Sequence, residues 1–300
     1  MGFLSSLAGD VFSLNLFSLE LPVFAALLGL FGLLVGSFLN VVIVRLPVMM
    51  HREERLFVLQ ASEQAVPDDL LGRYTLYTPA SHCPRCQAPV RWWMNIPLFS
   101  YAVLKGRCAA CQLGISWQYP LVELLACLSA VCAALAFGAS PKALAVAGLL
   151  WVLLALTVID LRTQLLPDLL TLPLLWAGLL VNTQSTVVPL DSAVWGAALG
   201  YMSLWTIYQL FKALTGKEGM GYGDFKLLAA LGAWLGIGMV LPIVLFASLV
   251  GSVVGGLMIV FKRLQPEVPI AFGPYLAAGG VLAVFYGERV VAWYLGLMRV

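Results

Sequence analysis

Long runs of apolar residues are the feature that most limits what this chain can fold into. Eight runs are long enough, or nearly long enough, to cross a lipid bilayer, which takes about 20 residues. They span residues 21–44, 120–137, 143–159, 169–181, 193–211, 227–239, 241–261 and 270–297. Only 11% of the 300 residues are charged, whereas a soluble domain carries about 25%. The sequence therefore predicts an all-α polytopic membrane protein with about eight transmembrane helices. The short fourth and sixth runs can instead be half-helices that line a cavity.

The basic residues indicate how these helices are oriented. If the polar loop 45–119 is cytoplasmic, every Lys and Arg except Lys142, Arg289 and Arg299 falls on the cytoplasmic side of an eight-helix arrangement. This is the distribution that the positive-inside rule describes. We therefore expect both chain ends to face the exterior, with membrane lipid as the surroundings. The net charge of +2 and the lack of a basic patch give no indication of a nucleic-acid partner.

A glycine-rich segment separates two of the apolar runs. Residues 219–226 read Gly-Met-Gly-Tyr-Gly-Asp-Phe-Lys, and three glycines in five positions disfavour a helix, at about 1 kcal/mol each. Asp224 follows the third glycine of this segment, and Asp160 directly follows the run 143–159 on the same predicted face of the membrane. Carboxylates at a membrane boundary are costly and usually functional. Two of them brought together can share a proton and activate a water by general acid and base catalysis. In the alternative interpretation, Asp224 is only a helix N-cap and the glycines only a turn.

The polar loop carries two Cys-x-x-Cys pairs. Cys83 and Cys86 are followed, after 21 residues, by Cys108 and Cys111. This spacing is typical of a tetrahedral zinc site, and four thiolates leave no open coordination position, so we expect a structural metal. Zinc would supply folding free energy to a small cytoplasmic zinc-ribbon-like domain. Redox chemistry and unliganded thiols are the alternatives, and a reducing cytosol disfavours disulfides.

Other polar residues near the membrane ends have several interpretations. Glu123 can pair with a basic residue or line a polar cavity. Asp168 is expected as the N-cap of the fourth run rather than as a catalytic group. Lys226 can lower the pKa of a carboxylate or extend to lipid headgroups. The pair 273–274, Gly-Pro, is expected to interrupt the last helix and to shape an entrance for the substrate.

Taken together, these motifs resemble those of the type IV prepilin peptidases, the prepilin leader peptidases and N-methyltransferases of bacterial inner membranes. The resemblance covers nearly the whole chain. It rests on several motifs in order, at residues 36–47, 83–86, 108–111, 119–123, 159–160, 166–168, 219–226 and 272–275.

The resemblance implies a membrane aspartic protease of the Gly-x-Gly-Asp kind, in which Asp160 and Asp224 match the two catalytic aspartates. It also implies the substrates, which are prepilins and pseudopilins of type IV pili and type II secretion. Their short basic leader stays in the cytoplasm and is cut after a glycine. The new N-terminal residue, usually phenylalanine, is then methylated from S-adenosylmethionine. The sequence has no Gly-rich strand-turn-helix for that cofactor, so we assign no residue to its site.

These expectations divide the chain into three parts and leave rival functions to test. Residues 1–44 form the N-terminal segment and first membrane helix, residues 45–119 the cytoplasmic loop with its zinc domain, and residues 120–300 the membrane protease domain. A peptidase without methyltransferase activity is one rival, although the four intact cysteines favour the bifunctional form. A transporter is another, but both aspartates lie at one face rather than at the midplane. A membrane scaffold that uses a zinc ribbon for protein contact leaves the Gly-x-Gly-Asp segment unexplained.

Overall fold

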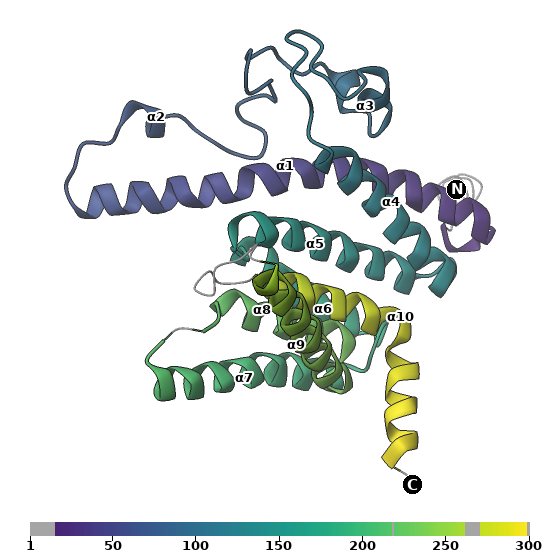
Figure 1. Cartoon of the computed structure of the whole chain (residues 1–300). Helices are drawn as coiled ribbons and strands as arrows, with labels where there is room; N and C mark the ends of the chain where they lie inside the picture. Colours follow the sequence, from purple (N-terminus) through teal and green to yellow (C-terminus); the bar gives the residue numbers. More distant parts are fainter. Residues whose placement is uncertain (1–15, 218, 262–270, 299–300) are drawn as a thin grey trace, which may run out of the picture.

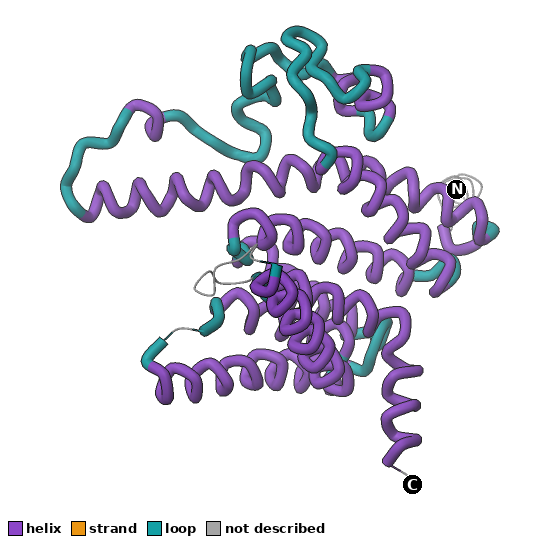
Figure 2. Tube along the Cα trace, viewed as in Figure 1, coloured by secondary structure: helices purple, strands orange, loops and turns teal. Residues whose placement is uncertain are grey.

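The computed structural model describes residues 16–217, 219–261 and 271–298, and within these ranges the regular structure is helical (Figure 1, Figure 2). The helices are α1 (Leu21–Ala61), α2 (Asp68–Leu71), α3 (Phe99–Val103), α4 (Gln118–Phe137), α5 (Pro141–Thr163), α6 (Asp168–Asn182), α7 (Leu190–Thr215), α8 (Tyr222–Leu235), α9 (Ile237–Val260) and α10 (Gly273–Met298), with short 3-10 turns at Leu16–Ser18 and Trp92–Asn95. Each of the eight predicted apolar runs corresponds to one helix, α1 or one of α4 to α10. The predicted fold class is therefore confirmed.

Four of the described helices, α1, α4, α5 and α9, are long and apolar enough to cross a membrane. Helix α6 and the first part of α10 are shorter apolar helices. The basic residues Lys262 and Arg263, which helped to orient the predicted helices, lie outside the described residues.

Helix α1 is longer than its apolar run. It continues past residue 44 through Pro47 and ends at Ala61, because residues 48–61 are mostly Met, Glu, Arg and Leu, which favour helix. Figure 1 shows this part of α1 running on beyond the ends of α4 and α5. Arg45 and Arg52 both lie over the ring of Tyr74, and Arg45 donates to the carbonyl of Thr75 at 3.0 Å. The loop after α1 is therefore held against the polar part of the helix.

Glycines allow the first two membrane helices to pack closely. A Cβ placed on Gly32 of α1 would lie 2.7 Å from the carbonyl oxygen of Ala126 in α4, and one on Gly36 would lie 2.7 Å from the Cα of Glu123. Small residues at such positions let helix backbones approach each other in the membrane, where packing supplies most of the association free energy. Helix α1 packs mainly on α4, which in turn packs on α5.

Helix α8 forms the centre of the second half of the chain. All its residues from Asp224 to Leu235 are buried except Lys226. It packs against α6, α7, α9 and α10, with Gly196 of α7 in direct contact with Gly232 of α8. The side chain of Asn182 in α6 donates to the carbonyl of Ala233 at 2.9 Å. After its first turn, α8 is apolar on every side, and such a helix is normally buried. Its length of about 20 Å fits the short element expected for the sixth run.

Candidate active site and metal centre

Asp160 lies in the last turn of α5. This helix begins at the N-cap Ser140, whose hydroxyl accepts from the Ala143 amide at 3.2 Å, and it ends at Gln164 in the left-handed conformation. Only 4% of Asp160 is exposed, and its Oδ2 atom is buried without a hydrogen-bond partner among the described residues. A buried polar atom without a partner is rare in native proteins and calls for an explanation. The backbone of Gly273 lies beside this carboxylate, so a water molecule or a substrate atom that binds Oδ2 would do so next to that backbone.

Asp224 lies in the first turn of α8, and its N-cap is Gly221. It is 7% exposed. The helix begins at Tyr222, so Gly223 is helical and the predicted loop is one turn shorter than expected. The interpretation of Asp224 as the N-cap is wrong, since Gly221 holds that position. The amides at a helix N-terminus carry partial positive charge, and the Asp224 carboxylate lies within that first turn.

Glycine and leucine bring the two carboxylates into one site. Asp160 lies within electrostatic range of Asp224. A Cβ on Gly273 would lie 2.5 Å from Asp160 Oδ2 and 3.1 Å from Leu166, while a Cβ on Gly223 would lie 2.6 Å from the same leucine. Leu166 therefore fills the space between the starts of α8 and α10, and both glycines are needed for the close approach.

The role of Gly273 differs from what the sequence suggested. The helix α10 begins at Gly273, so the Gly-Pro pair starts this helix rather than interrupting it. The backbone of Gly273 then lies against the Asp160 carboxylate. The Gly-Pro pair and the Phe-Gly-Pro-Tyr motif at residues 272–275 drew attention to this glycine, but nothing local to it indicates the aspartate as its neighbour.

The four cysteines of the polar loop come together in one cluster. Their Sγ atoms all lie within 4.8 Å of one another, with Cys83 and Cys111 at 3.7 Å and Cys86 and Cys108 at 3.9 Å. Tetrahedral zinc with Zn–S bonds of about 2.3 Å separates its sulfurs by about 3.8 Å. None of these cysteines forms a disulfide. The donor set and its spacing therefore fit a metal ion of tetrahedral preference.

The two cysteine pairs form equivalent turns. The Cys83 amide donates to Ala88 and the Cys108 amide to Leu113, while Gln87 and Gln112, each just after a pair, have positive φ angles of 58° and 59°. Backbone amides of Cys86 and Arg85 hydrogen-bond to the Cys83 sulfur and lower the pKa of Cys83 to about 6. In each turn, backbone donors point at the sulfur of the first cysteine and lower the pKa of Cys83 and of Cys108, which favours the thiolate form that binds metal.

Models of protein families and curated proteins both match this chain. The model of the bacterial peptidase A24 N-terminal domain matches residues 30–137, and that of the type IV leader peptidase family matches residues 147–256. The chain belongs to the type IV leader peptidase family.

Relatives in this family are similar over nearly their whole length. A protein of Aeromonas salmonicida is 52% identical over 90% of this chain and 93% of its own length. Proteins of Stutzerimonas stutzeri and Pseudomonas aeruginosa are 49% and 48% identical, over 89% of this chain and 92% and 91% of their own lengths. All three are named prepilin leader peptidase/N-methyltransferase. No solved structure matches the chain.

Other polar residues in this leader peptidase take roles that the sequence left open. Glu123 accepts a hydrogen bond of 2.8 Å from the Leu98 amide and so joins the cysteine-containing loop to α4. Asp168 is not the N-cap of α6, because Pro167 holds that position. Instead both Asp168 carboxylate oxygens lie 2.7 Å from Lys226 Nζ. Lys226 therefore points to α6, although it is only two residues from Asp224.

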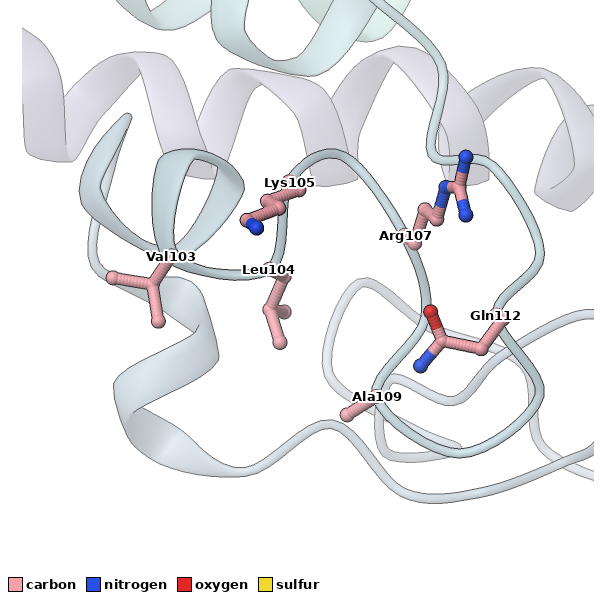
Figure 3. A pocket seen from close by; sticks show the side chains of 6 residues that line it. All are labelled: Val103, Leu104, Lys105, Arg107, Ala109 and Gln112. Carbon is pink, nitrogen blue, oxygen red and sulfur yellow. The ribbon is translucent and has the colours of Figure 1, made fainter.

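A hollow of about 480 Å³ lies beside the cysteine cluster (Figure 3). Figure 3 shows Lys105 beside Val103 and Leu104, with Arg107 and Gln112 across from them. Lys105 and Gly106 have positive φ angles of 49° and 66°, and these angles make the tight turn that presents Lys105. Small-molecule sites commonly have volumes of about 300–1,000 Å³, so the hollow is large enough for one.

Proposed function

We propose that this chain is a membrane aspartic endopeptidase that cleaves the leader from prepilins and pseudopilins and then N-methylates the new N-terminal residue. The observation that carries the proposal is the pair of buried aspartates, Asp160 at the end of α5 and Asp224 at the start of α8. The names of the relatives support both activities.

The two carboxylates divide the chemistry of hydrolysis between them. One carboxylate is ionised and takes a proton from a water molecule, which attacks the scissile carbonyl. The other is protonated and donates a hydrogen bond to the carbonyl oxygen, and the first carboxylate then gives the proton it took from water to the leaving amine. The unpartnered Asp160 Oδ2 offers an acceptor for the water or for a shared proton. The enclosing helices and Leu166 keep other water away, which strengthens these interactions.

The site is proposed to lie at the cytoplasmic face of the bacterial inner membrane. The positive-inside rule supports this orientation, since basic residues are gathered in the loop 45–119 and after α5 and α7. The resemblance to the family implies a basic leader that stays in the cytoplasm. Cleavage at that face would release the leader there and leave the apolar helix of the pilin in the membrane.

We assign Cys83, Cys86, Cys108 and Cys111 to a structural zinc ion. The sulfur separations of 3.7 Å and 3.9 Å support this assignment. Zinc would hold the two turns together in a loop that has little apolar core of its own. Since all four positions of a tetrahedral ion would be filled by protein sulfur, the ion would have no direct part in cleavage.

We place the methyl donor, S-adenosylmethionine, in the hollow beside this cluster. S-adenosylmethionine supplies the transferred methyl group when bound. Lys105, Arg107 and Gln112 would hold its polar groups, and Val103 and Leu104 would contact its apolar parts. An Arg107→Ala variant that methylates as well as wild type would exclude this placement.

The test of cleavage uses a full-length prepilin in membranes, with mass spectrometry of the product. We expect Asp160→Asn and Asp224→Asn each to lower the cleavage rate by about 10²–10⁴-fold. Asp191→Asn is the matched control, because Asp191 also lies in the first turn of a helix but is exposed. Retained cleavage in either active-site variant would remove that aspartate from the mechanism. The product mass from the wild-type protein shows directly whether a methyl group is added.

A further inference from the structure

Three helices border an apolar groove in the membrane part of the molecule. It has a volume of about 370 Å³. Its lining residues are Leu125, Leu128, Ser129 and Cys132 of α4, Leu150, Leu153, Leu154 and Thr157 of α5, and Pro274, Ala277, Ala278, Val281 and Phe285 of α10. On each helix these residues recur every three or four positions, so each set forms one stripe along its helix. The groove therefore runs lengthwise between α4, α5 and α10.

One end of the groove reaches the aspartate site. Asp160 follows Thr157 by three positions on α5, so it continues the same stripe. On α10 the stripe begins at Pro274, and the preceding residue, Gly273, lies against the Asp160 carboxylate. Two walls of the groove thus lead toward the same carboxylate, which lies about one helical turn beyond the last lining residues, Thr157 and Pro274.

The dimensions of the groove suit one face of a helix. From Pro274 to Phe285 the α10 wall is about 16 Å long at 1.5 Å per residue, which is about half of a hydrocarbon core of about 30 Å. Ser129, Thr157, Ala277 and Ala278 are small, and small residues allow a neighbouring helix to approach closely. Leu128 on the rim is 48% exposed, whereas Leu153 on the floor is 1% exposed. The groove is thus open along one side.

We propose that this groove seats the apolar helix of the prepilin, with the scissile bond at the aspartate end. This inference rests on the proposed function, since it names the place where the substrate of that reaction binds. The first helical turn after the cut would lie beside Thr157 and Pro274, and a turn about 10 residues further on would lie beside Cys132 and Phe285. A lipid chain is the alternative occupant, and it gives no reason for the groove to end at Asp160. Binding of the helix would fix the position of the peptide bond relative to the two carboxylates.

Cys132 provides a natural test, because it lies in the groove and is an exposed free thiol. A prepilin is made with a single cysteine in its apolar helix, at about position 3 or about position 10 after the cleavage point. It is combined in membranes with the Asp224→Asn variant, which keeps the substrate uncut, and oxidised with copper phenanthroline. We expect a mixed disulfide with Cys132 from position 10 and much less from position 3. Cys132→Ser should abolish the product.

Cys127 is the matched control on the same helix. Its sulfur lies near Gly29 of α1, on a different face of α4 from the groove. Cys127→Ser should therefore leave the crosslink unchanged. Absence of a crosslink to Cys132, or equal crosslinking to Cys127, would overturn the proposal and leave lipid as the occupant.

A second experiment fills the groove. Ala278→Trp is compared with Leu249→Trp, which adds the same ring on the exposed side of α9. Cleavage is measured on full-length prepilin and on a short peptide that spans the cut but lacks the apolar helix. We expect the ratio of prepilin to peptide cleavage to fall by at least about tenfold for Ala278→Trp, because only the long substrate uses remote binding. An unchanged ratio would overturn the groove proposal, whereas cleavage by Asp160→Asn would overturn the proposed function itself.

Discussion

The cysteine cluster and the aspartate site differ in how their parts are brought together. The four sulfurs come from two short turns within one loop, and hydrogen bonds inside each turn set their positions. The two aspartates come from α5 and α8, and a glycine from α10 completes their surroundings. The cluster can therefore form from local sequence and a metal ion, whereas the aspartate site exists only when three helices are packed. A substitution that impairs one of these sites and leaves the other intact therefore tests the comparison.

The largest effect is expected for Gly273→Ala. The added Cβ would lie 2.5 Å from Asp160 Oδ2 and 3.1 Å from Leu166, so the carboxylate or the start of α10 must move. A displacement of about 1 Å in a catalytic group can cost about 10²-fold in rate, and we expect a loss of at least that size in prepilin cleavage. The proposed zinc ion should still bind to the four cysteines, which a zinc assay of the purified variant would show.

Gly148→Ala is the matched control for this change. Gly148 lies on the same helix as Asp160, but a Cβ there meets nothing within 4 Å. Alanine is also the better helix former, by about 0.5–1 kcal/mol, so this variant should cleave at the wild-type rate. Normal cleavage by Gly273→Ala would show that Asp160 can shift without loss of activity. The close contact of Gly273 with Asp160 would then not be required for cleavage.

The difference between local patterns and contacts made by helix packing also explains what the sequence could predict. The Cys-x-x-Cys pairs and the apolar runs are local patterns, so the cluster and every membrane helix were predictable. The aspartates were predictable as a pair because each ends or begins an apolar run on one predicted face. The contacts of Gly273 with Asp160 and of Lys226 with Asp168 join residues far apart in sequence. Nothing local specifies such pairs, because they depend on how α5, α6, α8 and α10 pack.

Helix ends were also less predictable than helix positions. Helix α1 was expected to end with its apolar run at residue 44, but it continues to Ala61. Hydropathy reports where a helix leaves the lipid, and helix propensity then decides how far it continues in water. The division of the chain into parts at residues 44 and 119 stays a prediction.

Removal of the metal is expected to have the next largest effect, and it should act on the loop more than on the aspartates. Cys86→Ser removes one of the four proposed zinc ligands, so we expect loss of zinc and at least about a tenfold loss of methylation. Cleavage should fall by less, because α5 and α8 do not depend on the cluster for their packing. Metal content, methylated product and cleaved product are measured on the same preparation. Cleavage lost as completely as in Asp224→Asn would show that the two sites are not separable.

The hydrogen bond that joins the cysteine-containing loop to α4 is expected to make a contribution of intermediate size to the stability of the loop. Glu123 is buried and accepts from the Leu98 amide at 2.8 Å, so Glu123→Leu leaves that donor without its partner. The free energy that holds the loop against α4 should fall by about 1–3 kcal/mol. This loss should appear as faster hydrogen exchange at Leu98 and faster proteolysis of the loop 62–117. Glu123→Gln keeps a carbonyl acceptor and serves as the control. Equal exchange in both variants would mean that the loop is held elsewhere.

The smallest effect is expected for the ion pair beside the aspartates. Lys226 binds both oxygens of Asp168 at 2.7 Å, but the Asp168 side chain is 54% exposed, and exposed pairs contribute only about 0.2–1 kcal/mol. Lys226→Gln and Asp168→Asn should each leave cleavage within about threefold of wild type, and the double variant should be no worse than either one. The pH profile of cleavage is the sensitive readout. A shifted profile in Lys226→Gln alone would mean that this lysine acts on Asp224 as well as on α6, and the aspartate site would then include a charge from outside its carboxylate pair.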